Sequence, residues 1–102
     1  MGQLTDWIEK VIAGETVQFR PRGFSMSGKI ENKQLCTVRP VDPNTVEKGD
    51  VVLCRVGSAE YLHLVKAIRG KDSEREFMIG NNKGGTNGWT RKVYGKCIRV
   101  ES

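Results

Sequence analysis

The spacing of apolar residues near the start of the chain predicts a short amphipathic helix. Five apolar residues recur at intervals of three and four, which places them on one helical face: Leu4, Trp7, Ile8, Val11 and Ile12. Thr5 can cap the N-terminus of this helix, and Gly14 suits the position just beyond its C-terminus. We therefore expect one helix over about residues 4–13.

After Gly14 the pattern changes to runs rich in β-branched and aromatic residues, several of which alternate with polar positions. Turn sequences containing Gly, Pro, Asn and Asp separate these runs. The predicted strands cover residues 16–20, 35–41, 51–56, 61–68, 76–79 and 93–100. With little helix between them, they indicate a mainly β domain over about residues 16–100, either a curled antiparallel sheet or a partly open barrel.

One connection, residues 81–88, is long, and the sequence around it is rich in glycine and basic. It lacks the glycine spacing and the strand-to-helix context of a phosphate-binding loop, so we do not expect a nucleotide site. One interpretation is a mobile loop beside a substrate groove. We favour the other, a long hairpin connection in which Trp89 packs on the β domain.

Length and composition indicate a single domain over residues 1–102, with a mean hydropathy of −0.46. Its apolar runs are too short to cross a bilayer, and its first residues lack the pattern of a secretory leader. Three dispersed cysteines, Cys36, Cys54 and Cys97, are typical of a reducing compartment and form no metal-binding motif. We therefore expect a cytoplasmic protein without membrane contact, metal or cofactor.

The net charge is +5, and five basic residues without an acid lie between residues 77 and 100. A positive face of this size can attract nucleic acid, but solvation is the more common role, so nucleic-acid binding is not expected.

Candidate chemistry lies in two places, the turn sequence Arg22-Gly23-Phe24-Ser25-Met26 and the strand that holds the only histidine, His63. A serine hydroxyl becomes a good nucleophile when a base takes its proton. The flanking glycines allow a tight turn that exposes the backbone N–H groups of Ser25 and Met26 as an oxyanion site. An ordinary turn with a solvated serine, and a non-catalytic histidine, are the alternatives.

The order and spacing of several motifs along residues 20–100 resemble the superfamily that joins LexA-type self-cleaving repressors to signal peptidases. The motifs are Gly23-x-Ser25-Met26, Cys36-Thr-Val-Arg39, Lys48-Gly-Asp-Val-Val-Leu53, Tyr61-Leu-His-Leu-Val65, Ile79-Gly-Asn-Asn82 and Tyr94-Gly-Lys-Cys-Ile98. The resemblance implies a curled, mainly β fold in which Ser25 attacks a peptide carbonyl. It also implies that His63 is the general base, because histidine-type signal peptidases carry their base on the matching strand.

Lys66 is the other candidate base, since lysine serves in the repressors and in most bacterial signal peptidases. Side chains alternate along a strand, so His63 and Lys66 point to opposite faces and only one can reach Ser25. The motif register selects His63.

This chain differs from parts of the family pattern at three positions. Gly28 replaces a frequent proline, and Asn81 replaces an aspartate that supports the histidine in histidine-type signal peptidases. Gly23 replaces the serine of signal peptidases but matches the LexA-type repressors. Asn81 can orient an imidazole but cannot neutralise an imidazolium. Asp50 does not replace that acid, because its Gly-Asp turn fits a structural bond to the backbone.

Two functions follow as expectations. The first is a serine endopeptidase-like protein with a Ser25–His63 dyad that binds an extended peptide or protein substrate as an added strand. The second is a catalytically inactive binding or dimerisation module, resembling the repressor C-terminal domain of a phage-type regulatory system, in which a homodimer is expected.

Overall fold

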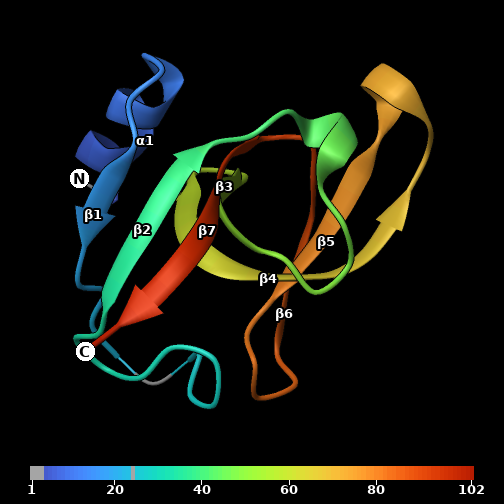
Figure 1. Cartoon of the computed structure of the whole chain (residues 1–102). Coiled ribbons are helices and arrows are strands. Elements are labelled where there is room, and N and C mark those ends of the chain that lie inside the picture. The colour runs from blue at the N-terminus through green and yellow to red at the C-terminus, as the bar shows by residue number, and fades with distance from the viewer. Residues whose placement is uncertain (1–3, 24) are drawn as a thin grey trace.

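The structure, a computed structural model, describes residues 4–23 and 25–102. In this part of the chain one α-helix, α1 (Thr5–Ile12), precedes seven strands (Figure 1). The strands are β1 (Val17–Phe19), β2 (Leu35–Pro40), β3 (Val51–Val56), β4 (Ala59–Arg69), β5 (Glu76–Gly80), β6 (Thr86–Thr90) and β7 (Val93–Glu101). The prediction of a mainly β fold with one short N-terminal helix is confirmed.

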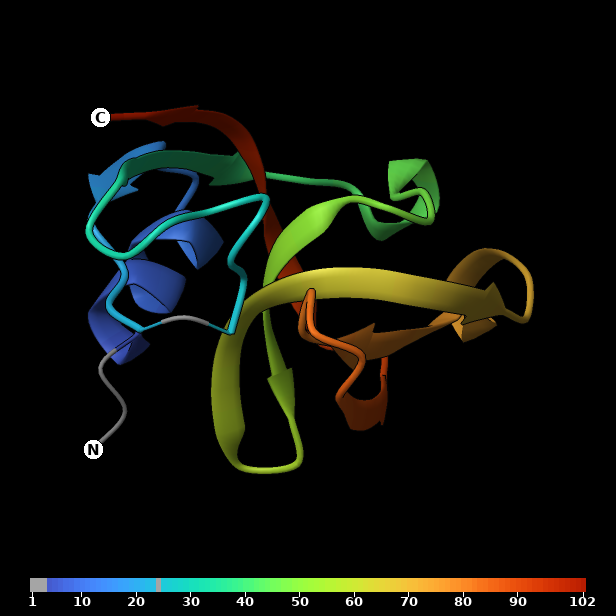
Figure 2. The same ribbon diagram turned by 90° about the horizontal axis from the view of Figure 1, so that it is seen from below.

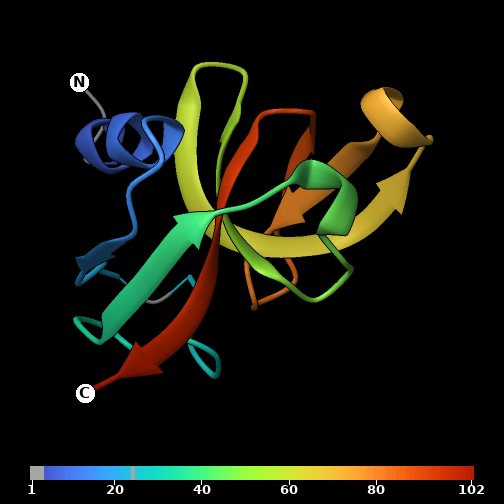
Figure 3. The ribbon, with the colours of Figure 1, turned by 45° about the horizontal axis from the view of Figure 1, so that its top comes forward.

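The strands form one antiparallel sheet in the order β1-β2-β7-β3-β4-β5-β6, and this sheet is curled but not closed. Its most curved member is the 11-residue β4, which bends away from its hairpin with β3 and runs on to β5 (Figures 2 and 3). The register of β4 against β5 shifts between Val65 and Ala67. Such a bulge bends a strand and increases its twist, so it contributes to the curl of the sheet.

The curled sheet holds two clusters of buried residues. The first joins α1 to β1, β2 and the start of β4 through residues such as Ile8, Phe19 and Val38. The second joins β3, β4, β5 and β7 through residues such as Phe77 and Val93. The candidate active site lies beside the first cluster.

Helix α1 ends as its sequence predicts. Gly14 has a φ of +95°, and its N–H donates to the carbonyl of Val11 at 3.0 Å. The N–H of Glu15 donates to the carbonyl of Lys10 at 3.0 Å. These two bonds form a Schellman motif, which needs a left-handed residue where Gly14 stands.

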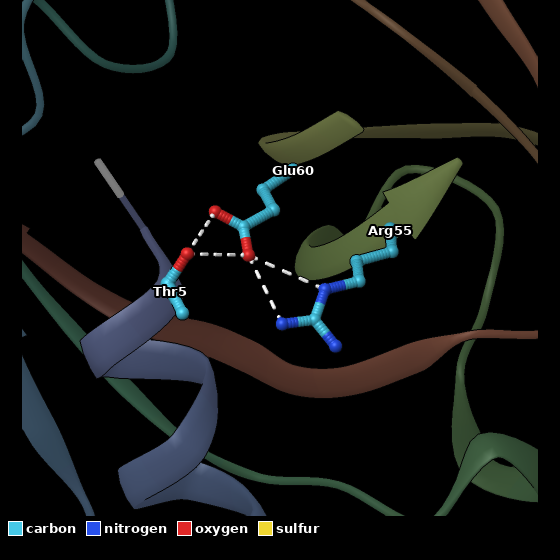
Figure 4. A network of polar contacts seen from close by, with 3 residues as sticks. All are labelled: Thr5, Arg55 and Glu60. Atoms are coloured by element: carbon cyan, nitrogen blue, oxygen red, sulfur yellow. Dashed lines mark hydrogen bonds and ion pairs between the residues drawn. The ribbon is translucent and has the colours of Figure 1, made fainter. Parts of the chain in front are cut away.

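The predicted N-cap is wrong. Leu4 occupies the N-cap position without a side-chain hydrogen bond, and Thr5 is the first helical residue. The hydroxyl of Thr5 donates instead to the carboxylate of Glu60, 2.8 and 2.9 Å from its two oxygens, and that carboxylate also pairs with Arg55 at 3.0 Å (Figure 4). A charged acceptor on β4 takes the hydroxyl and ties the helix to the β3–β4 hairpin.

The long connection after β5 is shorter than predicted, because Thr86–Thr90 forms the strand β6. Trp89 lies opposite Met78 of β5, with the Arg69 guanidinium 4.1 Å from its ring centroid. The hairpin interpretation was therefore the better one. Gly88, with a φ of +134°, interrupts the alternation that would have revealed the strand.

No helix in residues 4–23 and 25–102 is long and apolar enough to span a bilayer.

Candidate active site

Ser25 lies in an exposed turn between β1 and β2, which the next residue anchors. The side chain of Met26 is 5% exposed, and its carbonyl accepts the N–H groups of Lys29 and Ile30 at 3.0 and 2.8 Å. Polar positions on either side of a buried methionine thus leave the serine hydroxyl facing solvent while its backbone is held.

His63 lies on β4, opposite Val52 of β3. Its Nε2 atom is 3.1 Å from the Oγ atom of Ser25. The ring is half-buried and stacks on Tyr61, with ring centroids 4.8 Å apart. The structure therefore brings together the two residues that the sequence predicted as a dyad, 38 positions apart.

The other ring nitrogen of His63 contacts a residue that the sequence did not single out. Nδ1 lies 2.8 Å from the Oδ1 atom of Asn87, on β6. An amide oxygen only accepts, so Nδ1 carries the proton, and in the neutral ring Nε2 then presents its lone pair. The Ser25 hydroxyl then donates to Nε2, which is the arrangement that a general base requires.

Asn81, predicted to orient the histidine, does not do so. Its side-chain oxygen accepts the N–H groups of Lys83 and Gly85 at 2.8 and 2.9 Å. This side chain closes the β5–β6 turn by accepting two of the backbone N–H groups of the turn. The orienting contact belongs to Asn87, six residues further along the hairpin.

Asn82 joins the same hairpin to the serine turn. Its N–H donates to the carbonyl of Ser25 at 2.9 Å, and its side-chain amide donates to the carbonyl of Ser27 at 2.8 Å. Gly28 has a φ of +97°, and a Cβ there would stand 2.9 Å from the Asn82 amide nitrogen. A side chain at position 28 would thus displace the Asn82 amide from its bond to the Ser27 carbonyl.

Burial of the His63 ring lowers its pKa below the ordinary 6.5, while the hydrogen bond to Asn87 raises it by less. Burial penalises the charged ring, and the amide of Asn87 brings no negative charge to offset that penalty. The neutral imidazole is therefore the dominant form at pH 7, and its basic nitrogen is available.

Lys66 and Asp50 have other surroundings. The aliphatic stem of Lys66 lies over Gly80, where a Cβ would approach within 2.9 Å of its carbons. Asp50 accepts the N–H of Glu47 at 2.8 Å and pairs with Lys96 at 3.3 Å. The predicted structural role of Asp50 is confirmed.

A cavity of about 360 Å³ adjoins the dyad, and both Ser25 and His63 lie in its lining. Among the described residues, the N–H groups of Ser25 and Met26 have no hydrogen-bond acceptor. Their part in binding an oxyanion stays a prediction. The same part of the chain holds no cluster of three or more His, Cys, Asp or Glu side chains suited to a metal ion.

No protein-family model matches this chain, and no curated protein matches it in sequence.

Proposed function

We propose that this chain is a serine endopeptidase-like hydrolase that uses Ser25 as nucleophile and His63 as general base. One observation carries the proposal: Asn87, His63 and Ser25 form a continuous chain of hydrogen bonds, 2.8 and 3.1 Å long. A base held in one tautomer by a third residue is the arrangement that activates a serine in unrelated hydrolases. The resemblance of the motifs around Ser25 and His63 to LexA-type repressors and signal peptidases supports the same reaction.

In this mechanism the Ser25 hydroxyl attacks the peptide carbonyl carbon while His63 takes its proton at Nε2. The C–N bond then breaks, and the proton passes from His63 to the leaving amine. Water hydrolyses the resulting ester by the reverse sequence, and Ser25 regains its proton. Asn87 stays hydrogen-bonded to Nδ1 throughout, so the same nitrogen faces the substrate in both halves of the reaction.

The competing function is an inactive binding or dimerisation module with the same fold. It is favoured by the nature of the His63 partner, since Nδ1 contacts an amide rather than a carboxylate. The imidazolium that forms during catalysis is therefore less stabilised than in a triad with an acid. This difference predicts a slow enzyme if the first proposal is right and an unreactive serine if the second is.

A serine-reactive fluorophosphonate probe separates the two. We expect labelling of the wild-type protein, none of Ser25→Ala, and labelling of His63→Ala slower by about 100-fold, because general-base catalysis contributes about 10²–10⁴-fold. Intact-mass spectrometry should show the covalent adduct on the wild-type protein and none on Ser25→Ala. Labelling of the wild type no faster than that of a folded His63→Ala variant would leave the binding module as the better account.

A further inference from the structure

The cavity beside the dyad has apolar walls from several elements. Helix α1 and β1 contribute Trp7 and Phe19, the serine turn contributes Met26 and Ile30, and β4 contributes Leu62. Its volume of about 360 Å³ is near the lower end of ligand pockets, which start at roughly 300 Å³. It therefore suits one large side chain with its adjoining backbone better than an extended cofactor.

The helical wall of this cavity is held in place. The rings of Trp7 and Phe19 stack nearly parallel, with centroids 5.2 Å apart and an interplanar angle of 9°. The bond from Thr5 to the carboxylate of Glu60 fixes the first turn of the helix against β4 (Figure 4). A pocket formed before the ligand arrives spends little binding energy on ordering its own walls.

The acidic and the basic side chains at the edge of the cavity differ in their partners. Both acids in its lining are engaged: Glu60 with Thr5 and Arg55, and Glu31 with the N–H of Gly28 at 2.7 Å. Arg20, also in the lining, donates to the carbonyl of Lys33 at 2.9 Å. Among the described residues neither Arg20 nor Arg22 pairs with a carboxylate. The edge thus offers positive charge to an incoming acid.

We infer that this cavity binds a bulky apolar side chain of an extended peptide whose neighbouring residue is acidic. The apolar side chain enters between the Trp7–Phe19 wall and Leu62, and the neighbouring carboxylate meets Arg20 and Arg22. The inference rests on the proposed function for the identity of the ligand as a peptide substrate. It adds the class of substrate, and it requires only binding.

The test therefore measures binding without turnover. A Ser25→Ala protein that also carries Trp89→Phe has Trp7 as its only tryptophan, so its fluorescence reports on the wall of the cavity. The probes are three blocked pentapeptides, acetyl-Ala-Glu-Phe-Ala-Ala-amide and its versions with Phe replaced by Ala or with Glu replaced by Lys.

We expect the Phe peptide to bind at least about tenfold more tightly than the Ala peptide, because burial of a large apolar side chain raises binding affinity by about that factor or more. The Lys peptide should bind more weakly than the Glu peptide, by a factor that shrinks at high salt. In Arg22→Gln the Glu preference should fall, whereas it should be kept in Arg91→Gln, which alters an exposed arginine outside the cavity lining.

Equal binding of the Phe and Ala peptides, or absence of binding to a folded protein, would overturn the inference. Either result is separable from failure of the proposed function, which is read from probe labelling of Ser25. Labelling of Ser25 together with peptide binding that shows no preference would contradict only the inferred substrate class. Binding with the expected preference by a protein that does not label would support the peptide-binding cavity and contradict the proposed hydrolase function.

Discussion

Side chains of different chemical character lie on the two sides of the Ser25–His63 pair. On one side the β5–β6 hairpin contributes amides, with Asn87 on the histidine ring and Asn82 on the serine turn. On the other side α1 and β1 contribute aromatic rings, with Trp7 stacked on Phe19 above a buried cluster. The polar side positions the His63 ring and the backbone of the serine turn, and the apolar side holds the fold and shapes a cavity.

This difference implies that stability and reactivity can be altered separately. Hydrophobic burial scales with area and is not directional, so the apolar side contributes mostly to the free energy of unfolding. A hydrogen bond contributes only about 1 kcal/mol to stability but fixes orientation. Substitutions on the two sides should therefore have effects of different kinds.

The largest expected effect is on the apolar side. Phe19 is 7% exposed, and Phe19→Ala should lower the free energy of unfolding by about 3–5 kcal/mol, the usual cost of truncating a buried aromatic. Urea denaturation measures this loss, with the exposed Asn44→Ala variant as a control expected to change stability by about 0.5 kcal/mol or less. A loss below about 1 kcal/mol would mean that the apolar side is not what holds this half of the fold.

The next effect is on the polar side. Asn87→Ala removes the acceptor for Nδ1, so the ring can turn or change tautomer. We expect probe labelling of Ser25 to slow by about 10- to 100-fold, while stability falls by about 1 kcal/mol. Asn44→Ala again serves as the matched control, since it removes an exposed amide elsewhere. If Asn87→Ala labelled like the wild type, Asn87 would have no part in positioning the base.

The response to pH sharpens the same contrast. The unprotonated ring of His63 is the base, so labelling is lost as pH falls through its pKa. Burial lowers this pKa below 6.5, so wild-type labelling should persist through neutral pH and decline only below 6.5. Asn87→Asp places a negative charge beside Nδ1 and raises the pKa. Its labelling profile should therefore shift to higher pH. A profile that does not shift would contradict the contact between His63 and residue 87.

The smallest effect concerns the link between the two sides. Thr5→Val keeps the shape of the side chain but removes the bond to Glu60, which retains its pairing with Arg55. We expect a loss of about 1 kcal/mol in the free energy of unfolding and little change in labelling. Thr16→Val, at an exposed position, is the control and should be nearly neutral. A slowing of labelling as large as that of Asn87→Ala would show that the helix also positions the dyad.

Local pattern was enough to predict most of the fold. The helix, six of the strands and the glycine that ends the helix follow from apolar spacing and turn residues, which act over a few positions. The sequence did not predict the strand β6 because Gly88 interrupts its alternation of apolar and polar residues. The strand depends on pairing with β5, which local pattern does not reveal. The cap at Thr5 was wrong because Glu60, distant in sequence, competes for its hydroxyl.

The candidate site divides in the same way. Ser25 and His63 carry distinctive residue types within recognisable motifs, so the sequence alone singled them out. Asn87 and Asn82 are two of several asparagines in a glycine-rich hairpin, and only the pairing of β5 with β6 decides which one reaches the ring. Asn81 was chosen for its motif position, but its side chain closes the turn.

The protonation of one ring tests the arrangement most directly. His63 is the only histidine in the chain, so its two ring nitrogens can be followed by ¹⁵N NMR without overlap. With Nδ1 donating to Asn87, the neutral ring should carry its proton on Nδ1, leave Nε2 unprotonated toward Ser25, and titrate with a pKa below 6.5. A proton on Nε2 at neutral pH, or a pKa at or above 6.5, would contradict a base held ready for the serine.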